Sequence, residues 1–135
     1  MLVKFTFNTL IPELSVTDIE KSKHFYVSIL GFKIEYERIE DKFAFISYGE
    51  SQMMIEQING YWETGILDYP FGRGINLQIK TSSLDLLHEK LILNGVTLFR
   101  DIDEFSYRQD DVLHNGREFL VQDPDGYLLR FLQFL

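Results

Sequence analysis

The chain has 135 residues, 45% of them hydrophobic and 15% aromatic, which is enough to build the core of one domain. The chain has 13 Lys and Arg and 21 Asp and Glu, which gives a net charge of −8. This charge disfavours binding to nucleic acid or anionic membranes and favours a cationic ligand. Because cysteine is absent and no apolar run approaches the roughly 20 residues of a membrane span, the sequence excludes disulfides and cysteine-ligated zinc and predicts a soluble, cytoplasmic protein.

The first half of the chain predicts one strand, one helix and three further strands. Alternating apolar residues predict a strand over 10–16, with Leu10, Leu14 and Val16 on one face. Thr17 and Glu20 have the spacing of a capping box that would begin a helix over 18–30. Three strands are then expected over 32–38, 43–48 and 52–57.

The second half repeats this order. A strand over 75–80 precedes a helix that Ser82 or Ser83 caps and that Gly95 ends. Strands are expected over 96–99, 118–122 and 127–133. The sequence therefore predicts an α+β fold of two βαβββ modules around a concave cleft: module one over about 8–58, a linking loop over 59–73 and module two over about 74–135 of a single domain. A single ferredoxin-like sheet is the alternative, but too many strands are predicted for it.

Several motifs of the chain resemble the vicinal oxygen chelate superfamily, which includes glyoxalases, bleomycin resistance proteins and dioxygenases. The stretches that carry the resemblance are Pro12-Glu13-Leu14-x-Val16-x-Asp18, His24-Phe25-Tyr26, Leu30-Gly31-Phe32, Gly116-Arg117-Glu118-Phe119 and Asp123-Pro124-Asp125-Gly126. The likeness is closest to the bleomycin resistance proteins. It implies the paired-module fold and either a divalent metal site or, in the antibiotic resistance branch, metal-free drug binding in a homodimer cleft.

The residues at the positions implied for metal ligands do not favour a metal. The resemblance places these positions at Ile11, Gly74, Arg130 and Glu56, and only the last offers a ligand oxygen. His24, His88 and His114 lie on two helices and in a polar stretch, which is not a converging ligand set. No metal and no other cofactor is therefore expected.

Arg130 lies in an otherwise apolar strand and needs a partner if it points into the cleft. If the flanking Leu129 and Phe131 pack on the helix, Arg130 faces the cleft, and Glu56 at the equivalent position of module one is the expected partner. An exposed arginine at the strand's edge remains the alternative.

Other residues are expected to line the ligand site by alternation or by aromatic character. They are Phe43, Asn76 and Gln78 in strands, and Trp62, Tyr107 and Asn115 in two long loops that would act as lids or dimer contacts. Asn115 occupies the place where the resistance proteins carry a tryptophan, which weakens the case for bleomycin itself as ligand.

Three functions are compatible with these features. A metal-independent, non-catalytic protein that sequesters a drug or metabolite as a homodimer is favoured. A metal-dependent lyase, isomerase, dioxygenase or thiol transferase of the superfamily is the alternative. An acid–base enzyme using Glu56 or Glu13 ranks last, because a carboxylate beside an arginine is a weak base.

Overall fold

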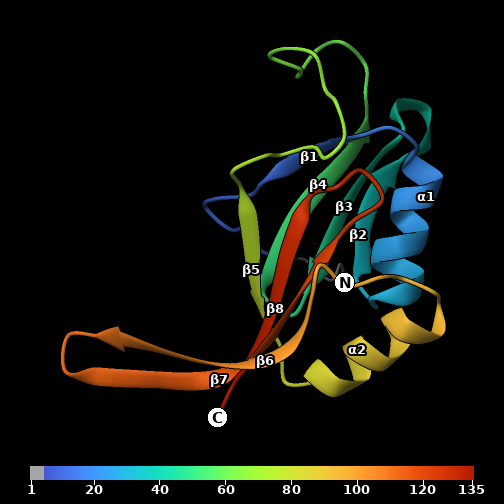
Figure 1. Cartoon of the computed structure of the whole chain (residues 1–135). Helices are drawn as coiled ribbons and strands as arrows, with labels where there is room; N and C mark the ends of the chain where they lie inside the picture. Colours follow the sequence, from blue (N-terminus) through green and yellow to red (C-terminus); the bar gives the residue numbers. More distant parts are fainter. Residues whose placement is uncertain (1–4) are drawn as a thin grey trace. The chain divides into compact units, whose positions relative to one another are not determined.

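The computed structural model describes residues 5–135, and the chain divides between Leu67 and Asp68 into two compact units. Each unit contains one four-stranded sheet with helical residues between its first two strands (Figure 1). The predicted α+β architecture of two βαβββ modules is confirmed, and a single ferredoxin-like sheet is excluded by the two separate sheets.

Unit 1 forms a mixed sheet whose first strand lies beside its last. Its elements are β1 (Glu13–Val16), α1 (Ile19–Lys23), the π-helical η1 (His24–Ile29), β2 (Lys33–Arg38), the 3-10 turn η2 (Ile39–Asp41), β3 (Phe43–Tyr48) and β4 (Ser51–Gln57). The strand order is β1-β4-β3-β2, in which β1 runs parallel to β4 and the other pairs are antiparallel.

Two details at the start of unit 1 differ from the expectations. The strand expected from residue 10 begins only at Glu13, and Leu10 is 84% exposed rather than packed with Leu14. Pro12 has no N–H to give to a strand partner, which limits the pairing on its side. The helix is capped by Asp18 and not by Thr17, since the Asp18 carboxylate accepts from the N–H groups of Glu20 and Lys21.

Unit 2 repeats the same strand order. Its elements are β5 (Asn76–Lys80), α2 (Leu84–Leu93), β6 (Arg100–Gln109), β7 (Val112–Gln122) and β8 (Leu128–Phe134), arranged as β5-β8-β7-β6. The expected strand over 96–99 is wrong, because the second strand begins only at Arg100. The stretch 105–116, expected to be a loop, instead forms most of a long β6–β7 hairpin.

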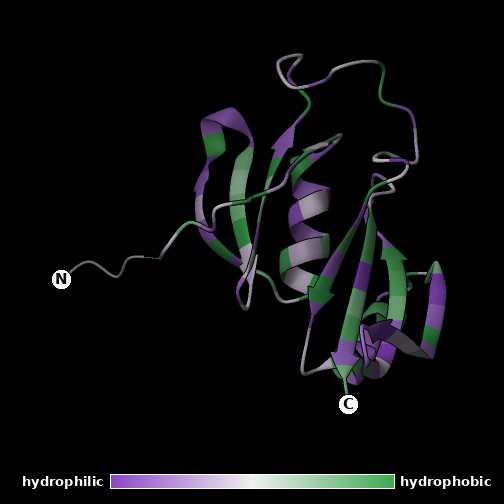
Figure 2. Ribbon diagram, turned by 90° about the vertical axis from the view of Figure 1, so that its left-hand side faces the viewer, coloured by the Kyte–Doolittle hydropathy of each residue, from purple (hydrophilic) through white to green (hydrophobic). Residues whose placement is uncertain are grey.

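Alternation along the strands decides which side chains are buried. Leu14 and Val16 in β1, like Leu129 and Phe131 in β8, are at most 7% exposed, while the residues between them face the other side of their sheet. Figure 2 shows this alternation as successive green and purple bands along the strands. In unit 2 this alternation leaves polar side chains such as Gln78 and Arg130 on one face of the sheet, whereas β3 of unit 1 is buried on both faces from Phe43 to Ser47.

Among the described residues, no helix is long and apolar enough to cross a lipid bilayer.

Candidate functional site

In unit 1, the side chains of Arg38, Phe43 and Glu56 form a row across the sheet, on the face opposite the helix. Glu56 on β4 lies directly across from Phe43 on β3, and Phe43 lies across from Arg38 on β2. The Arg38 guanidinium carbon stands 4.0 Å from the centre of the Phe43 ring, a cation–π contact. A carboxylate, an aromatic ring and a guanidinium are thus adjacent on one surface.

The loop after β4 returns over Glu56 and satisfies its carboxylate. The Trp62 indole N–H donates to Glu56 Oε1 over 2.9 Å, and the Asn59 side-chain amide donates to the same oxygen over 3.1 Å. Glu56 is 8% exposed, whereas Trp62 is 54% exposed. The structure therefore brings the predicted residues Phe43, Glu56 and Trp62 together, with Trp62 partly open to solvent.

The conformation of this loop is fixed by a second carboxylate. Glu63 accepts hydrogen bonds from the backbone N–H groups of Asn59, Gly60 and Trp62. Burial alone would raise the pKa of Glu63, but hydrogen bonds from its own backbone N–H and from these three N–H groups outweigh it and hold the pKa below its ordinary value. Glu63 thus holds the backbone at Trp62, while the indole is held by its own hydrogen bond to Glu56.

Glu13 on β1 contributes a further negative group to this region. Burial raises the pKa of Glu13, the charge of Glu56 raises it further, and Arg38 partly opposes both effects. The mutual influence of Glu13, Glu56 and Arg38 places them in one electrostatic neighbourhood, in which the negative charges are not fully compensated.

A pocket of about 410 Å³ in unit 1 shares Phe43 with this row. Its lining consists of Thr17, Asp18, Ile19, Glu20, Lys23, Glu37, Ile39, Lys42, Phe43 and Gln57. The volume lies in the range of small-molecule sites, and the lining mixes apolar groups with charges of both signs.

In unit 2, the Arg130 guanidinium has two hydrogen-bond partners within its own unit. It donates to Glu118 Oε2 over 3.2 Å and to the Asn76 side-chain oxygen over 3.3 Å. The side chain of Arg130 is 33% exposed and that of Glu118 is 22% exposed, so the ion pair is partly solvated. Gln78 lies directly beside Arg130 in the β5–β8 ladder, and the predicted residues Asn76, Gln78 and Arg130 therefore share one face of the sheet.

The register of the last hairpin could have indicated Glu118. The turn over residues 123–126 is closed by a hydrogen bond from Asp123 N–H to the Tyr127 carbonyl, which pairs Gln122 with Leu128 and hence Leu120 with Arg130. Glu118 is two residues from Leu120 and therefore on the same face. The pairing of Arg130 with Glu56 stays a prediction, because it joins residues of the two units.

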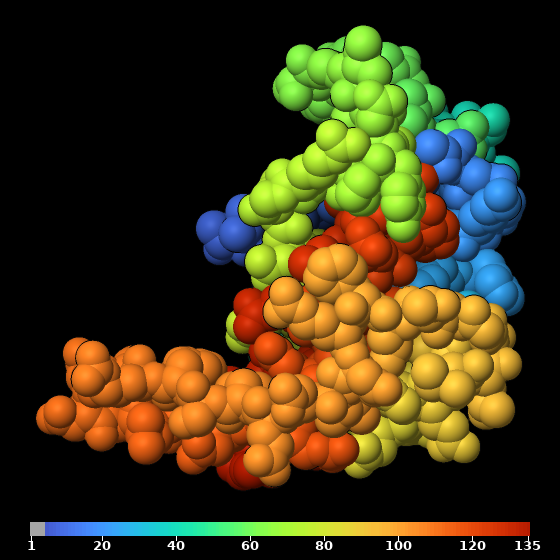
Figure 3. Space-filling model, in the orientation of Figure 1, coloured from blue at the N-terminus to red at the C-terminus, as the bar shows by residue number. Residues whose placement is uncertain are grey.

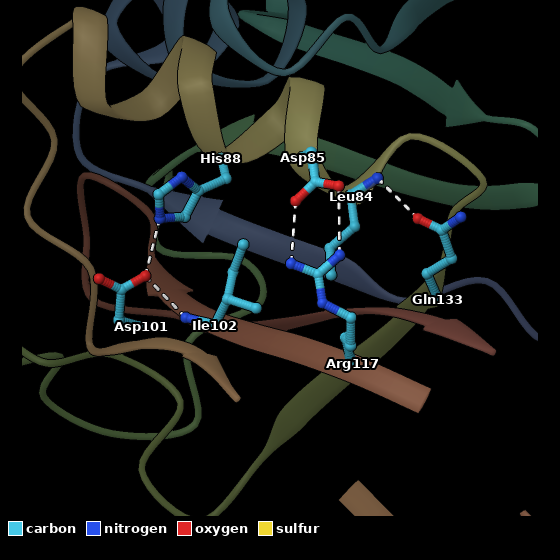
Figure 4. A network of polar contacts seen from close by, with 7 residues as sticks. All are labelled: Leu84, Asp85, His88, Asp101, Ile102, Arg117 and Gln133. Carbon is cyan, nitrogen blue, oxygen red and sulfur yellow. Dashed lines mark hydrogen bonds and ion pairs between the residues drawn. The ribbon is translucent and has the colours of Figure 1, made fainter. Parts of the chain in front are cut away.

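The other side of the unit 2 sheet is tied to α2 by polar contacts (Figure 4). Arg117 on β7 makes a two-pronged ion pair with Asp85, at 3.0 and 3.1 Å. His88 Nε2 lies 2.7 Å from Asp101, whose carboxylate also accepts from the Ile102 N–H. His88 packs edge-on against Phe119, and these contacts orient the helix on its sheet rather than forming a metal site.

A pocket of about 410 Å³ in unit 2 borders the Arg130 cluster through Glu118. It is lined by Arg100, Asp101, Ile102, Asp103, Glu104, Glu118 and Leu120. Four of these seven residues are acidic.

Tyr107 and Asn115 are not loop residues, which corrects the prediction of a second lid. Both lie in the β6–β7 hairpin, where Tyr107 pairs with His114 and Asn115 pairs with Ser106. The prediction failed because the strand is rich in exposed polar residues and lacks the apolar alternation of a half-buried strand. Their role as ligand-binding residues stays untested.

Within the described part of the chain, no group of three or more His, Cys, Asp or Glu residues converges as a metal site would require. Of the ligand positions implied by the resemblance, Ile11, Gly74 and Arg130 have no donor chemistry for a cation, and the Glu56 oxygen already accepts two hydrogen bonds. The residues present therefore do not fit the superfamily's usual metal.

Comparison with known proteins identifies the family. Residues 8–131 match the Glyoxalase/Bleomycin resistance protein/Dioxygenase superfamily. The chain belongs to this superfamily. The predicted superfamily and its paired-module fold are thereby confirmed, whereas the closer likeness to bleomycin resistance proteins stays a prediction.

Individual relatives of the superfamily are distant. The lactoylglutathione lyase of Neisseria meningitidis is 25% identical over 125 residues, which cover 89% of this chain and 86% of the relative. The probable lactoylglutathione lyase of Synechocystis is 27% identical over 130 residues, covering 89% and 90%. The fosfomycin resistance protein FosX of Listeria monocytogenes superposes with a TM-score of 0.62 at 20% identity, covering 94% and 91%, and shows the fold alone.

Proposed function

We propose that the protein binds a small organic molecule without a metal and without transforming it, as a sequestering protein. The observation that carries this proposal is the state of Glu56. It is the only implied ligand position with an oxygen donor, and its Oε1 is occupied by Trp62 and Asn59. The half-exposed Trp62 indole offers aromatic surface for a ligand beside Glu56, while the neighbouring Phe43 ring is buried at 3% exposure, and this supports binding rather than metal chemistry.

The ligand we propose carries positive charge. The net charge of −8 and the four acidic residues around the unit 2 pocket favour a cation. The pKa of Glu13 points the same way, because it is raised by burial and then by the charge of Glu56. An aromatic ring beside carboxylates is also the chemistry that recognises organic ammonium groups. We further propose that the ligand is held in a homodimer cleft to which Asn76, Gln78, Tyr107, Asn115 and Arg130 contribute.

The fluorescence of Trp62, the only tryptophan in the chain, supplies a direct test. Titration with bleomycin and with a panel of organic cations and matched anions should change this emission for a cationic probe only. Glu56→Gln should weaken that binding at least tenfold, while Glu40→Gln, which removes the same charge at an exposed position of the same unit, should leave it unchanged. Equal responses to cations and anions, or equal effects of the two substitutions, would remove the basis of the proposal.

Metal-dependent catalysis is the second candidate, favoured by the lactoylglutathione lyases that match most of the chain at 25–27% identity. It requires that Glu56 leave its hydrogen bonds and that the other ligands come from positions not implied by the resemblance. Lactoylglutathione lyase activity that appears on adding a divalent metal, and disappears with Glu56→Gln, would favour this candidate over sequestration.

A further inference from the structure

The β6–β7 hairpin of unit 2 has an unpaired outer edge. β6 ends the strand order β5-β8-β7-β6, and its regular ladder with β7 runs from Asp103 opposite Glu118 to Gln109 opposite Val112. β8 accompanies β7 only as far as Gly116, so the outer part of the hairpin extends beyond the rest of its sheet. Figure 1 shows this extension, and in Figure 3 the orange residues of the hairpin project from the yellow and red residues of the same unit.

The sequence of this edge is complementary to itself about Ser106. The central stretch of β6 reads Glu104-Phe105-Ser106-Tyr107-Arg108, with an acid and a base at equal distances from the serine and an aromatic residue on either side of it. An antiparallel pairing of two copies around a two-fold axis at Ser106 sets Glu104 opposite Arg108 of the second copy, and Phe105 opposite its Tyr107. Opposite charges and aromatic pairs at directly facing positions stabilise a strand pair.

We propose that two copies of this chain associate by antiparallel pairing of their β6 edges, with Ser106 on the two-fold axis. The occupant of this edge is therefore a second copy, whose charge pattern is complementary to the first. This assembly surface is independent of the identity of the ligand proposed above.

Other registers of the same two edges are less favourable. If the axis passes through Phe105 or Tyr107, neither Glu104 nor Arg108 faces a residue of the opposite charge. Moving it to Glu104 or to Arg108 sets two like charges directly across from each other, which destabilises the pair. Only the register centred on Ser106 pairs both charges and keeps the full regular stretch 103–109 in contact.

The side chains of the edge are already ordered in the single chain. Phe105 stacks on Tyr107 at 5.8 Å, Tyr107 stacks on His114 at 5.2 Å, and Phe105 meets Phe134 edge-on at 5.7 Å. These rings form a row on one face of the hairpin, and the Tyr107 of a second copy would extend that row past Phe105. Pre-ordering of the side chains lowers the entropy that association must overcome.

The charged and backbone groups of the edge are accessible to a partner. Within residues 5–135, neither Glu104 nor Arg108 takes part in an ion pair, and both are exposed. The Glu104 N–H donates to the neighbouring Asp103 carboxylate over 2.8 Å rather than to β7, so it is directed away from the existing ladder. Association would replace this local bond with ladder bonds between the two copies.

Charge reversal tests both the surface and its register. Sedimentation velocity at low salt should show the wild-type protein associating to twice its 15.9 kDa mass. Arg108→Glu and Glu104→Arg should each weaken association at least tenfold, because each places two like-charge pairs across the axis, and the double variant Glu104→Arg/Arg108→Glu should restore it. Lys80→Glu, the same change of charge on the opposite edge strand β5, is the control and should have no effect.

A cysteine at the axis gives a second test that does not depend on charge. Facing residues of an antiparallel pair have Cα atoms about 4.5–5.5 Å apart, within the range of a disulfide. Since the chain has no cysteine, Ser106→Cys should form a covalent dimer on mild oxidation, whereas Val112→Cys at the tip of the same hairpin should not. A monomer at all concentrations, a dimer insensitive to both single reversals, or no rescue by the double variant would overturn the proposal, even if the ligand is bound normally.

Discussion

At the scale of single residues, the groups of greatest chemical interest are satisfied by neighbours in their own unit. The sequence indicated that Arg130 needs a partner, which it finds in Glu118, while the carboxylate of Glu56 accepts hydrogen bonds from Trp62 and Asn59. The partners of Glu56 depend on the conformation of a loop, which residue spacing does not predict. The partner of Arg130 depends on the register of a hairpin, which the turn over residues 123–126 could have indicated.

The raised pKa of Glu13 predicts a destabilising charge at neutral pH. The pKa of Glu13 is raised in the folded state by burial and then by Glu56, with Arg38 opposing both effects. An acid with a raised folded-state pKa stabilises the fold when it is protonated, and this stabilisation is lost as the pH rises through the folded-state pKa. Glu13→Gln should therefore increase the free energy of unfolding at pH 7, and the gain should shrink towards zero near pH 4. Urea titrations between pH 4 and pH 8 measure this difference, and a gain independent of pH would contradict it.

The partial exposure of the Arg130–Glu118 pair predicts a modest contribution to stability. At 33% and 22% side-chain exposure, the pair lies much nearer the surface regime than the buried one, so the coupling energy should be about 0.5–1 kcal/mol. A double-mutant cycle with Arg130→Ala and Glu118→Ala in denaturant measures it. The same cycle with Glu56→Ala in place of Glu118→Ala tests the pairing predicted from the sequence. Strong coupling to Glu56 and none to Glu118 would reverse our assignment.

At the scale of elements, the sequence predicted strands well where several apolar residues lie close together. β3 was expected over residues 43–48 and is found there, and β4 and β8 begin within one residue of their expected starts. β6 was missed because seven of its ten residues are charged, Ser or Gln, so no buried face marks it as a strand. The capping residue was misassigned because Thr17 and Asp18 are adjacent and both have side chains that cap helices.

The base of the β6–β7 hairpin depends on the absence of a side chain at Gly116. A Cβ atom there would lie 2.5 Å from the Gln133 carbonyl oxygen and 2.5 Å from the Phe105 ring. Gly116→Ala should therefore destabilise the protein by about 1–3 kcal/mol, since backbone as well as a packed ring must move. Gly65→Ala is the matched control, because its Cβ would meet nothing within 4 Å, and it should change stability by less than about 0.5 kcal/mol. Thermal unfolding of both variants measures the difference, and similar shifts would show that the contact at Gly116 is unimportant.

At the scale of the whole molecule, the sequence repeat is reproduced in the structure as two sheets with equivalent strand orders. Superfamily membership was predictable because it rests on motifs spread over almost the whole chain. The ligand was not predictable, since neither the charge of −8 nor the aromatic loop specifies a shape.

The side chains at the implied metal-ligand positions predict that the purified protein carries no stoichiometric transition metal. Apolar, absent and cationic side chains at Ile11, Gly74 and Arg130 cannot replace water around a divalent ion. Elemental analysis of protein purified without chelator should find much less than one metal per chain, and chelation should not change the unfolding temperature. About one bound metal whose removal lowers that temperature would restore the metal-dependent alternative.

The parallel pairing that completes each sheet has a consequence for how the chain acquires its structure. In unit 1 the strands β2, β3 and β4 follow one another as antiparallel neighbours, whereas β1 must find β4, with Glu13 beside Met54. Closing so long a loop costs more entropy than joining adjacent strands, and the same holds for Asn76 and Leu128 in unit 2. Each sheet should therefore form its meander first and add its opening strand last. During synthesis on the ribosome, all the strands of unit 1 emerge before those of unit 2. Pulsed hydrogen exchange during refolding should accordingly protect the amides of β3 before those of β1, and the reverse order would contradict this sequence of events.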